Sequence, residues 1–386
     1  MILPLLLALP WLAVLAFLLL WARVPRELPT HAPARQPPVS VVVPARNEAA
    51  NVAACVGSLA ASSYPSFEII VVDDRSEDGT AELARAVGAD HARSLRVVEG
   101  APLPEGWLGK PWACAQGAGA ASGEVLLFTD ADTVHGPDLL GRAVAALEQD
   151  GADLLTVVGR QVMGSFWERL VQPQMFLTLI FRFFDVERAA ASGRWRGVIA
   201  NGQFLLFRRE AYAELGGHAA VKDEVAEDLA FAQIVVRSGR RLSLRMAEGA
   251  FATRMYRSLG EIVAGWSKNF IMGGLATMPP RLRPLVVPVS TVVGVTLWLV
   301  PPVTLVAALA GVGGEGLLAW ALVTVAASFL LWTNLTRRMG APAAYGLLYP
   351  LGAAVGMMIF LLSWWRGRRV VWKGRSYVLR DLSERP

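Results

Sequence analysis

Residues Val125–Asp132 read Val-Leu-Leu-Phe-Thr-Asp-Ala-Asp, an apolar run and a threonine followed by two carboxylates one residue apart. The apolar run is typical of a strand that is buried on both faces of a parallel sheet. Asp130 and Asp132 would then follow at the carboxyl end of the strand, where open α/β sheets bind their ligands. Carboxylates in that position suit a hard divalent cation that is shared with substrate phosphates. The alternative is a solvated turn in which the aspartates cap the next helix.

The segments around this stretch predict the fold. Short apolar runs at Val39–Val43, Glu68–Val72 and Leu95–Val98 are expected to be strands, and they alternate with helical segments such as 110–121. Asn47 is placed to cap the helix after the first strand. This alternation with short connections predicts an α/β fold with a doubly wound, mostly parallel sheet.

The composition indicates a membrane protein. A hydrophobic fraction of 54% with 18% charged residues is too apolar for an ordinary soluble protein. Residues 2–21 form an uncharged run of spanning length. This run lacks the basic start and the convincing cleavage site of a signal peptide, so we interpret it as an anchor. Later apolar stretches that are also long enough to span lie at about 285–312, 316–335 and 343–363.

These features divide the chain into five parts. We expect an anchor (1–24), a proline-rich linker (25–38), a globular domain (39–280), transmembrane helices (281–365) and a basic tail (366–386). Positive charges beside the anchor and in the tail predict that the domain and the tail both lie on the cytoplasmic side of the inner membrane. Four complete crossings would separate them, so one segment is expected not to cross. The candidates are a hairpin at Pro301-Pro302 and the last apolar stretch.

Charge and cysteine content limit the partners. The formal net charge of +5 fits anionic lipids and phosphates, and no basic-aromatic motif points to nucleic acid. The two cysteines, Cys55 and Cys114, predict neither a disulfide framework nor a zinc site. Residues 165–186 are very aromatic but are interrupted by charge and Pro173. They predict an interfacial helix beside the bilayer, with a helix packed over the domain core as the alternative.

Three motifs in this order resemble those of family-2 glycosyltransferases with the GT-A fold. They are Val-Val-Pro-Ala-Arg-Asn-Glu48, Val-Val-Asp-Asp-Arg-Ser-Glu-Asp-Gly-Thr80 and Thr-Asp-Ala-Asp132. Gly106-Trp-Leu-Gly-Lys-Pro-Trp112 is similar to the membrane subgroup that glycosylates hopanoids, carotenoids or ceramide-like lipids. The resemblance covers roughly 39–280, with weaker support from Trp372-Lys-Gly-Arg-Ser-Tyr377.

The resemblance implies roles on the donor side. Asp73 is expected to accept the uracil N–H, while Asp74 supports either the turn or the ribose. Asp132 is the implied ligand of Mg²⁺ or Mn²⁺, with Asp130 beside it facing the donor or the metal. His135 either approaches the metal or is an ordinary loop residue. The other donor-side candidates are Pro44, Arg46, Glu48, for which a helix-dipole role competes, and Lys110, for which a surface lysine is the alternative.

The resemblance also implies a catalytic pair. Glu227-Asp228 resembles the family's Glu-Asp motif at a helix N-terminus, with Asp228 as general base and a capping pair as the alternative. The Gln-x-x-Arg-Trp motif of processive synthases is absent, which argues against a polymer synthase. This absence leaves open which cation supports the leaving diphosphate. Candidates on the acceptor or diphosphate side are Gly202, Arg257, Trp266 and Lys268.

The resemblance implies an inverting glycosyltransferase that moves a hexose from a UDP-hexose, expected to be UDP-glucose. The apolar spans and the expected interfacial helix predict that the enzyme is membrane-bound and that its acceptor is a lipid. A polyprenyl-phosphate glycosyltransferase is the nearest alternative. A nucleotidyltransferase is another, but it should carry a glycine-rich triphosphate loop, and Pro-Ala-Arg-Asn-Glu48 is not one. A non-catalytic membrane scaffold is the third.

Overall fold

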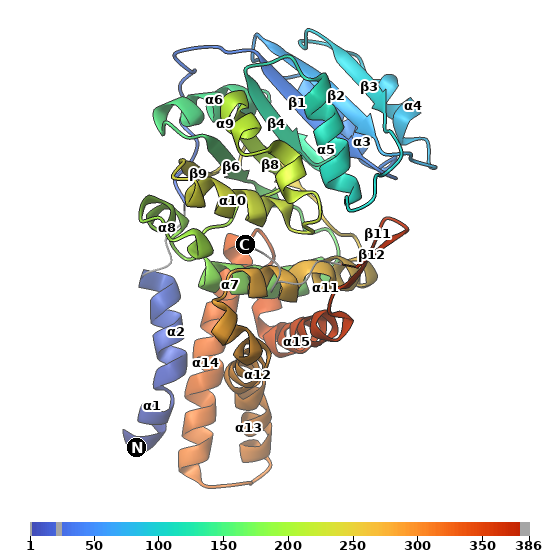
Figure 1. The fold of residues 1–386 in the computed structure, drawn as a ribbon. Coiled ribbons are helices and arrows are strands. Elements are labelled where there is room, and N and C mark those ends of the chain that lie inside the picture. The colour runs from blue at the N-terminus through green and yellow to red at the C-terminus, as the bar shows by residue number, and fades with distance from the viewer. Residues whose placement is uncertain (1, 21–24, 379–386) are drawn as a thin grey trace.

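A seven-stranded sheet forms the centre of the globular domain (Figure 1). The computed structural model describes residues 2–20 and 25–378. The strand order is β3-β2-β1-β4-β8-β6-β9, and β8 runs antiparallel to both of its neighbours while the other pairs are parallel. The predicted doubly wound, mostly parallel sheet is therefore confirmed. Its strands are β1 (Val39–Ala45), β2 (Phe67–Asp73), β3 (Leu95–Glu99), β4 (Val125–Thr129), β6 (Leu154–Val158), β8 (Phe204–Arg208) and β9 (Leu242–Met246).

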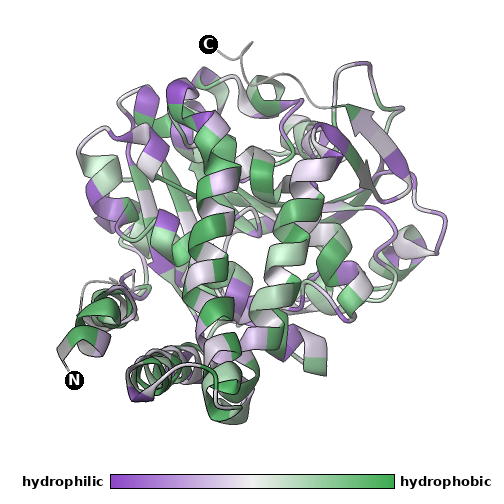
Figure 2. Ribbon diagram, turned by 90° about the horizontal axis from the view of Figure 1, so that it is seen from below, coloured by the Kyte–Doolittle hydropathy of each residue, from purple (hydrophilic) through white to green (hydrophobic). Residues whose placement is uncertain are grey.

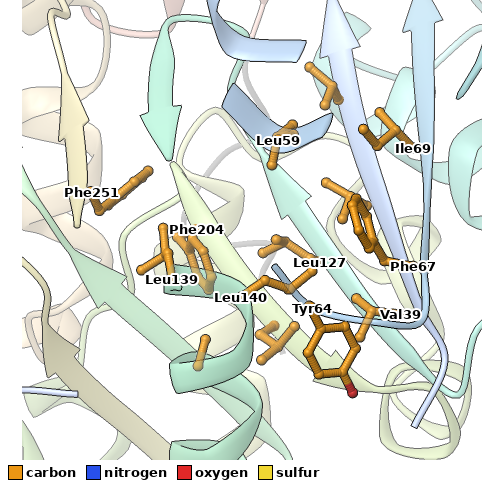
Figure 3. Packing of buried hydrophobic residues seen from close by; sticks show 14 of the residues in the cluster. Val39, Leu59, Tyr64, Phe67, Ile69, Leu127, Leu139, Leu140, Phe204 and Phe251 are labelled. Atoms are coloured by element: carbon orange, nitrogen blue, oxygen red, sulfur yellow. The ribbon is translucent and has the colours of Figure 1, made fainter. Parts of the chain in front are cut away.

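Apolar side chains cover both faces of this sheet. Successive residues of one strand enter different clusters, as Ile69 and Ile70 of β2 and Leu126 and Leu127 of β4 do. Figure 3 shows the cluster that contains Ile69 and Leu127. Burial on both faces explains why the strands are continuous apolar runs rather than alternating ones. The helices that connect the strands are α3 (Val52–Ala60), α4 (Thr80–Arg85), α5 (Gly109–Ala120), α6 (Leu139–Gln149), α8 (Val186–Ala191), α9 (Arg209–Glu214) and α10 (Glu227–Arg237).

The expected cap at Asn47 is wrong. The helix α3 begins at Val52, and Asn47 lies before it with a φ of 52°. Its Oδ1 instead accepts the N–H of Glu77 at 3.0 Å. Asn47 therefore connects the loop after β1 to the loop after β2, because asparagine tolerates the left-handed conformation that this contact requires.

Short elements complete the domain. A small sheet with the order β5-β10-β7 lies beside the main one. Leu28, in the expected linker, is buried and donates its N–H to the carbonyl oxygen of Met246 at the end of β9. The short elements are β5 (Thr133–His135), β7 (Arg160–Gln161), β10 (Phe251–Thr253), and the 3₁₀ segments η1 (Trp195–Gly197), η2 (Gly217–Val221), η3 (Pro280–Leu282) and η5 (Ala343–Leu348).

A layer of helices separates the sheet domain from a bundle of apolar helices (Figure 1). It contains α7 (Phe166–Arg182) and α11 (Leu259–Ala276), which lie between the two parts. Ser165 and Glu168 form a capping box at the start of α7. The side chains of Leu170, Val171 and Met175 pack against α11 and α15 (Tyr349–Arg366). Of the predicted helix at 165–186, the part Phe166–Arg182 is helical and a turn follows at 183–185. Its position at a bilayer surface stays a prediction.

Three helices among the described residues are long and apolar enough to cross a membrane. They are Pro280–Leu309, Glu315–Arg338 and Ala343–Arg366. The first comprises η3, α12 (Arg283–Gly294), the π segment η4 (Val295–Leu299) and α13 (Val300–Leu309), and the second is α14 (Glu315–Arg338). The helix runs on through Pro301 and Pro302, so the expected hairpin there is wrong. The prolines fall in the first turn after the π segment, where wider backbone spacing accommodates their missing N–H groups.

The apolar helices differ in direction. The N-terminal helices α1 (Ile2–Leu7) and α2 (Leu9–Leu20) pack alongside α14, with the rings of Trp11 and Trp320 edge to face at 5.3 Å. In contrast, α15 lies across the axis of α14 and beside α11, as both Figure 1 and Figure 2 show. After α15 the chain ends in a hairpin of β11 (Arg369–Trp372) and β12 (Arg375–Val378). Parts of the expected anchor (21–24) and tail (379–386) lie outside the described residues.

Candidate active site

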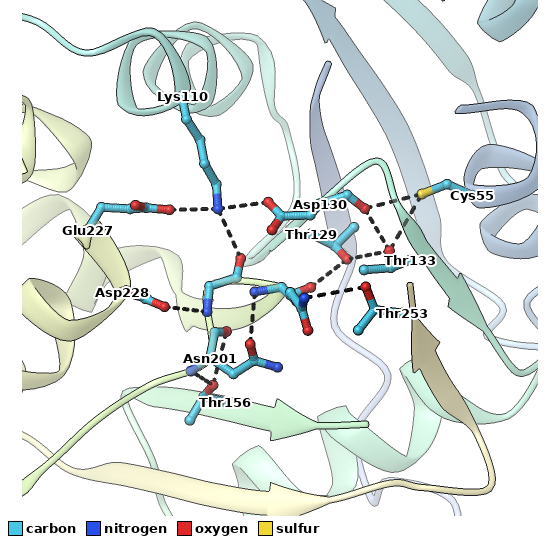
Figure 4. Close-up of polar contacts among 12 residues, drawn as sticks. Cys55, Lys110, Thr129, Asp130, Thr133, Thr156, Asn201, Glu227, Asp228 and Thr253 are labelled. Carbon is cyan, nitrogen blue, oxygen red and sulfur yellow. Dashed lines mark hydrogen bonds and ion pairs between the residues drawn. The ribbon is translucent and has the colours of Figure 1, made fainter. Parts of the chain in front are cut away.

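Lys110 links two acidic motifs that are far apart in the sequence (Figure 4). Its Nζ lies 2.7 Å from Oδ1 of Asp130, after β4, and 2.6 Å from Oε1 of Glu227, at the start of α10. It also lies 3.4 Å from the carbonyl oxygen of Gly202. Burial opposes the charge, but the two carboxylates outweigh it and hold the pKa of Lys110 well above its usual value. The two motifs therefore meet around one permanently charged lysine.

Asp132 carries an unsatisfied carboxylate oxygen. Its Oδ1 is buried and has no hydrogen-bond partner among the described residues. Burial, and then the negative charges of Asp130 and Glu48, raise the pKa of Asp132 to about 7. A divalent cation would relieve both conditions, so this donor set fits a hard metal ion. The described residues hold no group of three His, Cys, Asp or Glu side chains that could hold an ion alone. Further ligands would therefore come from a substrate or from water.

Asp228 is held by backbone groups at the start of α10. Its Oδ2 accepts the N–H of Gly202 at 2.8 Å, and its Oδ1 accepts the N–H of Leu229 at 2.7 Å. A Cβ on Gly202 would lie only 3.0 Å from Oδ2, so glycine permits this approach. Burial and the charge of Glu227 raise the pKa of Asp228 to about 6. A fixed carboxylate with a pKa near neutrality has the properties of a general base.

The paired aspartates after β2 have different surroundings. Asp73 is buried, and its Oδ2 accepts the N–H of Ser76 at 3.2 Å, which closes the turn. Its Oδ1 is buried without a partner in the described part of the chain. Asp74 instead pairs with Arg375, whose Nη1 lies 2.6 Å from its Oδ2. The predicted contact of Asp73 with a uracil ring stays a prediction.

The C-terminal hairpin contributes two residues that sequence reasoning missed. Lys373 lies 2.9 Å from Oε1 of Glu48, and Arg375 pairs with Asp74. Arg46 donates through Nε to the carbonyl oxygen of Lys373 at 3.2 Å. The one available signal was the weak resemblance of the segment 372–377, which gave no indication of a contact with the domain.

One large cavity brings most of the predicted residues together. Its volume is about 1750 Å³. The predicted residues that line it are Pro44, Arg46, Glu48, Asp74, Lys110, Asp130, Asp132, Gly202, Glu227, Asp228, Arg257, Trp266 and Lys268. Asp73 does not line it. The cavity extends to apolar side chains of α7, α12 and α14, including Phe176, Leu179, Val286, Leu331 and Leu335.

Residues 40–216 match the family model described as Glycosyl transferase family 2. The chain carries a family-2 glycosyltransferase domain. It is 26% identical over 351 residues to the protein named 4,4'-diaponeurosporenoate glycosyltransferase from Staphylococcus aureus (strain MRSA252), covering 88% of each chain. The similarly named protein of Staphylococcus haemolyticus is 26% identical over 246 residues, and the match spans 62% of this chain and 63% of that protein. The enzyme is thus a glycosyltransferase.

A solved structure supports the same fold. The mannosyltransferase PcManGT from Pyrobaculum calidifontis, solved with GDP-Man and Mn²⁺, has a TM-score of 0.52 and 22% identity to this chain. The alignment covers 92% of this chain and 94% of that one. The predicted GT-A fold is therefore confirmed for the glycosyltransferase.

The acceptor-side candidates of the glycosyltransferase lie on or near α11. Nε1 of Trp266 donates to Oε1 of Gln172 on α7 at 2.8 Å. Arg257 donates to Oδ1 of Asn51 at 2.7 Å, and both residues line the cavity. Burial lowers the pKa of Lys268 to about 8, while Glu227 opposes the shift. Lys268 therefore lies within electrostatic range of Glu227 and Asp228.

His135 lies close behind the Asp130-Ala-Asp132 motif of this glycosyltransferase. Its Nε2 lies 2.9 Å from Oγ1 of Thr133, and its ring packs against Phe204 and Phe251. Burial lowers the pKa of His135 to about 3. His135 is therefore a buried, neutral residue at the end of β5 rather than an ordinary loop residue.

Proposed function

We propose that this protein is a membrane-bound, inverting hexosyltransferase that moves a hexose from a UDP-hexose, UDP-glucose first among them, to a hydroxyl or carboxyl group of a membrane lipid. The names of the Staphylococcus relatives, which specify diaponeurosporenoate as acceptor, support the lipid class. The Pyrobaculum structure, which contains GDP-Man and Mn²⁺, supports a nucleotide-sugar donor.

The observation that carries the proposal is the composition of the cavity. Its polar end holds Asp130, Asp132 and Asp228, and its apolar end reaches helices that are long enough to cross a membrane. A nucleotide sugar needs the first environment and a lipid chain needs the second. A continuous cavity with both ends supports transfer between the two.

The proposed reaction is a single displacement at the anomeric carbon. An acceptor oxygen forms a bond to that carbon while the bond from the carbon to the diphosphate oxygen breaks. Asp228 takes the acceptor proton as the acceptor oxygen attacks. Glu227 holds Lys110, and Lys110 offsets negative charge between the two acidic motifs.

Asp132 and Asp130 would hold a divalent cation, Mg²⁺ or Mn²⁺. The buried, unpartnered Oδ1 of Asp132 supports this assignment. Such an ion would supply charge neutralisation for the leaving diphosphate. Asp132 and Asp130 would orient the donor through it.

The arrangement of the helices supports a topology in which the helix from Pro280 to Leu309 and α14 cross the membrane. The N-terminal apolar run that contains α1 and α2 would make a third crossing. With α15 lying along the membrane surface, the catalytic domain and the C-terminal hairpin both fall on the cytoplasmic side of the inner membrane. In this topology the last apolar stretch is the segment that does not cross, so the domain and the tail would share one side of the membrane.

The decisive experiment is to incubate membranes that contain the protein with radiolabelled nucleotide sugars and to identify the labelled lipid. We expect transfer from a UDP-hexose to a lipid extracted into organic solvent. Donor hydrolysis without a labelled lipid, or label in a water-soluble product, would contradict the lipid acceptor.

A polyprenyl phosphate is the second candidate acceptor. Arg337 and Arg338, at the C-terminal end of α14, line the cavity and would suit an anionic head group. A screen of polyprenyl phosphate against carotenoid, sterol-like and ceramide lipids separates the two. Transfer to the phosphate lipid alone would favour this second function.

A further inference from the structure

The C-terminal hairpin β11–β12 is docked on the loops expected to bind the donor. Two bonds join Arg375 to Asp74, from Nη1 to Oδ2 at 2.6 Å and from Nη2 to Oδ1 at 3.1 Å. The Asp74 side chain is 3% exposed, so this bidentate pair is nearly removed from water. Lys373 adds a second pair, with Nζ 2.9 Å from Oε1 of Glu48 and 3.1 Å from the carbonyl oxygen of Asn47.

Arg46 holds the hairpin and the loop after β2 together. Its Nη1 donates to the carbonyl oxygens of Asp74 and Arg75 at 2.6 and 3.0 Å. Its Nε donates to the carbonyl oxygen of Lys373 at 3.2 Å. The guanidinium is therefore already engaged by backbone oxygens. Three residues predicted to touch the donor, namely Arg46, Glu48 and Asp74, line the cavity and also contact the hairpin.

The backbone is shaped for this contact on both sides. Lys373 and Gly374 have φ values of 45° and 79°, which is the pattern of a tight two-residue turn with a fixed twist. On the domain side, a Cβ on Gly109 would lie 2.8 Å from Nη1 of Arg375 and 2.9 Å from Oδ2 of Asp74. Glycine at the start of α5 therefore leaves the space that the ion pair occupies.

We propose that the C-terminal hairpin is a wall of the donor site and that Lys373 is a cation for the donor's diphosphate. Lys373 and Tyr377 line the same cavity as Asp130, Asp132 and Asp228. The three cations at this edge, Arg46, Lys373 and Arg375, exceed the two carboxylates that they contact. A lysine ammonium is a common partner of phosphate. This inference rests on the proposed function.

The inference changes the roles of two predicted donor ligands. Asp74 and Glu48 become positioning residues that hold the hairpin over the nucleotide. It also answers which cation supports the diphosphate in a chain that lacks the Gln-x-x-Arg-Trp motif. The hairpin reaches the site only because it lies on the same side of the apolar helices as the domain.

The test is equilibrium binding of UDP and GDP, with Mn²⁺, to the full-length protein in nanodiscs. We expect Arg375→Asp and Asp74→Arg each to raise the Kd of the preferred nucleotide at least about tenfold, as for the loss of a charge-assisted contact. The double variant should restore the Kd to within about threefold of wild type. Arg369→Asp is the matched control, because Arg369 lies exposed on the same hairpin and makes the same charge change.

Lys373→Ala gives a second measurement if the charge reversals disturb folding. It should raise the Kd about tenfold while the melting temperature stays at the wild-type value. The hairpin's role would be overturned if the wild type binds nucleotide and Lys373→Ala and both charge reversals bind it with the same Kd as Arg369→Asp. A wild-type protein that binds neither nucleotide would overturn the proposed function itself, and this inference with it.

Discussion

The two ends of the cavity are built in different ways. At the polar end several charged groups have fixed partners: Lys110 pairs with Asp130 and Glu227, and Asp228 accepts the backbone N–H of Gly202. At the apolar end, half-buried or buried side chains of α7 and α14 face the cavity with no fixed polar partner. The difference indicates that the enzyme fixes the geometry of the reacting groups and leaves the apolar end adaptable. The following predictions test this contrast.

The largest effect is expected from Asp228→Asn. The amide keeps the shape and can still meet the N–H of Gly202, but it cannot take the acceptor proton. We expect turnover to fall by about 10²–10⁴-fold, the usual contribution of a positioned base. Donor binding, measured by calorimetry, should stay near wild type.

Asp138→Asn serves as the control, because Asp138 is an exposed aspartate whose side chain contacts Arg142 on the surface. It should leave turnover unchanged. Wild-type turnover in purified Asp228→Asn would show that another group accepts the proton.

Lys110→Met should lower both the stability of the fold and the turnover. Removing the ammonium leaves Asp130 and Glu227 facing each other without the cation that joins them. Breaking a buried ion pair from one side costs about 3 kcal/mol or more. We expect a clear loss in the free energy of unfolding, followed by thermal or denaturant melting, together with loss of turnover.

Lys222→Met is its matched control, since Lys222 is exposed beside α5. Its melting should match wild type. Equal stability of both variants would mean that Lys110 is not the cation that balances the polar end.

Phe176→Ala tests the apolar end. Phe176 lines the cavity and packs edge to face on Trp266, with ring centroids 5.7 Å apart. Losing this contact surface should raise the KM for the lipid acceptor about tenfold, equivalent to about 1.4 kcal/mol. Donor hydrolysis in the absence of acceptor should not change. Phe166→Ala, on the same helix but outside the cavity, should keep the wild-type KM, and an equal rise in both would point to a general effect on α7.

Most residues of the polar end could be predicted from the sequence, because they come directly after the carboxyl ends of predicted strands. The carboxyl ends of β1, β2 and β4 lie at one edge of a parallel sheet, so the residues after them must meet. For that reason the residues after β1, β2 and β4 were expected at one site, and Glu48, Asp74, Asp130 and Asp132 do line one cavity, whereas Asp73 does not. Lys110 was found as a donor-side candidate, but its position between Asp130 and Glu227 depends on α10, which enters from a distant part of the chain.

The features that could not be predicted from the sequence are contacts between residues far apart in the chain and very short elements. Arg375 meets Asp74 across 301 positions, and nothing local to either residue records that pairing. β5, β7 and β10 have two or three residues each, too few for an alternating pattern. Asn47 was misjudged because its side chain serves a neighbouring loop rather than its own helix. The prolines at 301–302 suggested a break in the helix. The helix continues because the π segment before them accommodates their missing N–H groups.

The smallest effect is expected from pH. Burial and Glu227 raise the pKa of Asp228 to about 6, with Lys110 of α5 opposing the shift and Lys268 of α11 also in range. A base must be ionised to accept a proton, so turnover should rise with pH through about 6 and level off above it. At saturating donor and acceptor, kcat near pH 6 should be about half its plateau value and should fall about tenfold per unit below pH 5. The residual activity of Asp228→Asn should lack this inflection. An inflection retained in the variant would assign the titration to Glu227 or to a group in the acceptor. Asp228 would then not be the general base, despite the backbone contacts that hold its carboxylate in place.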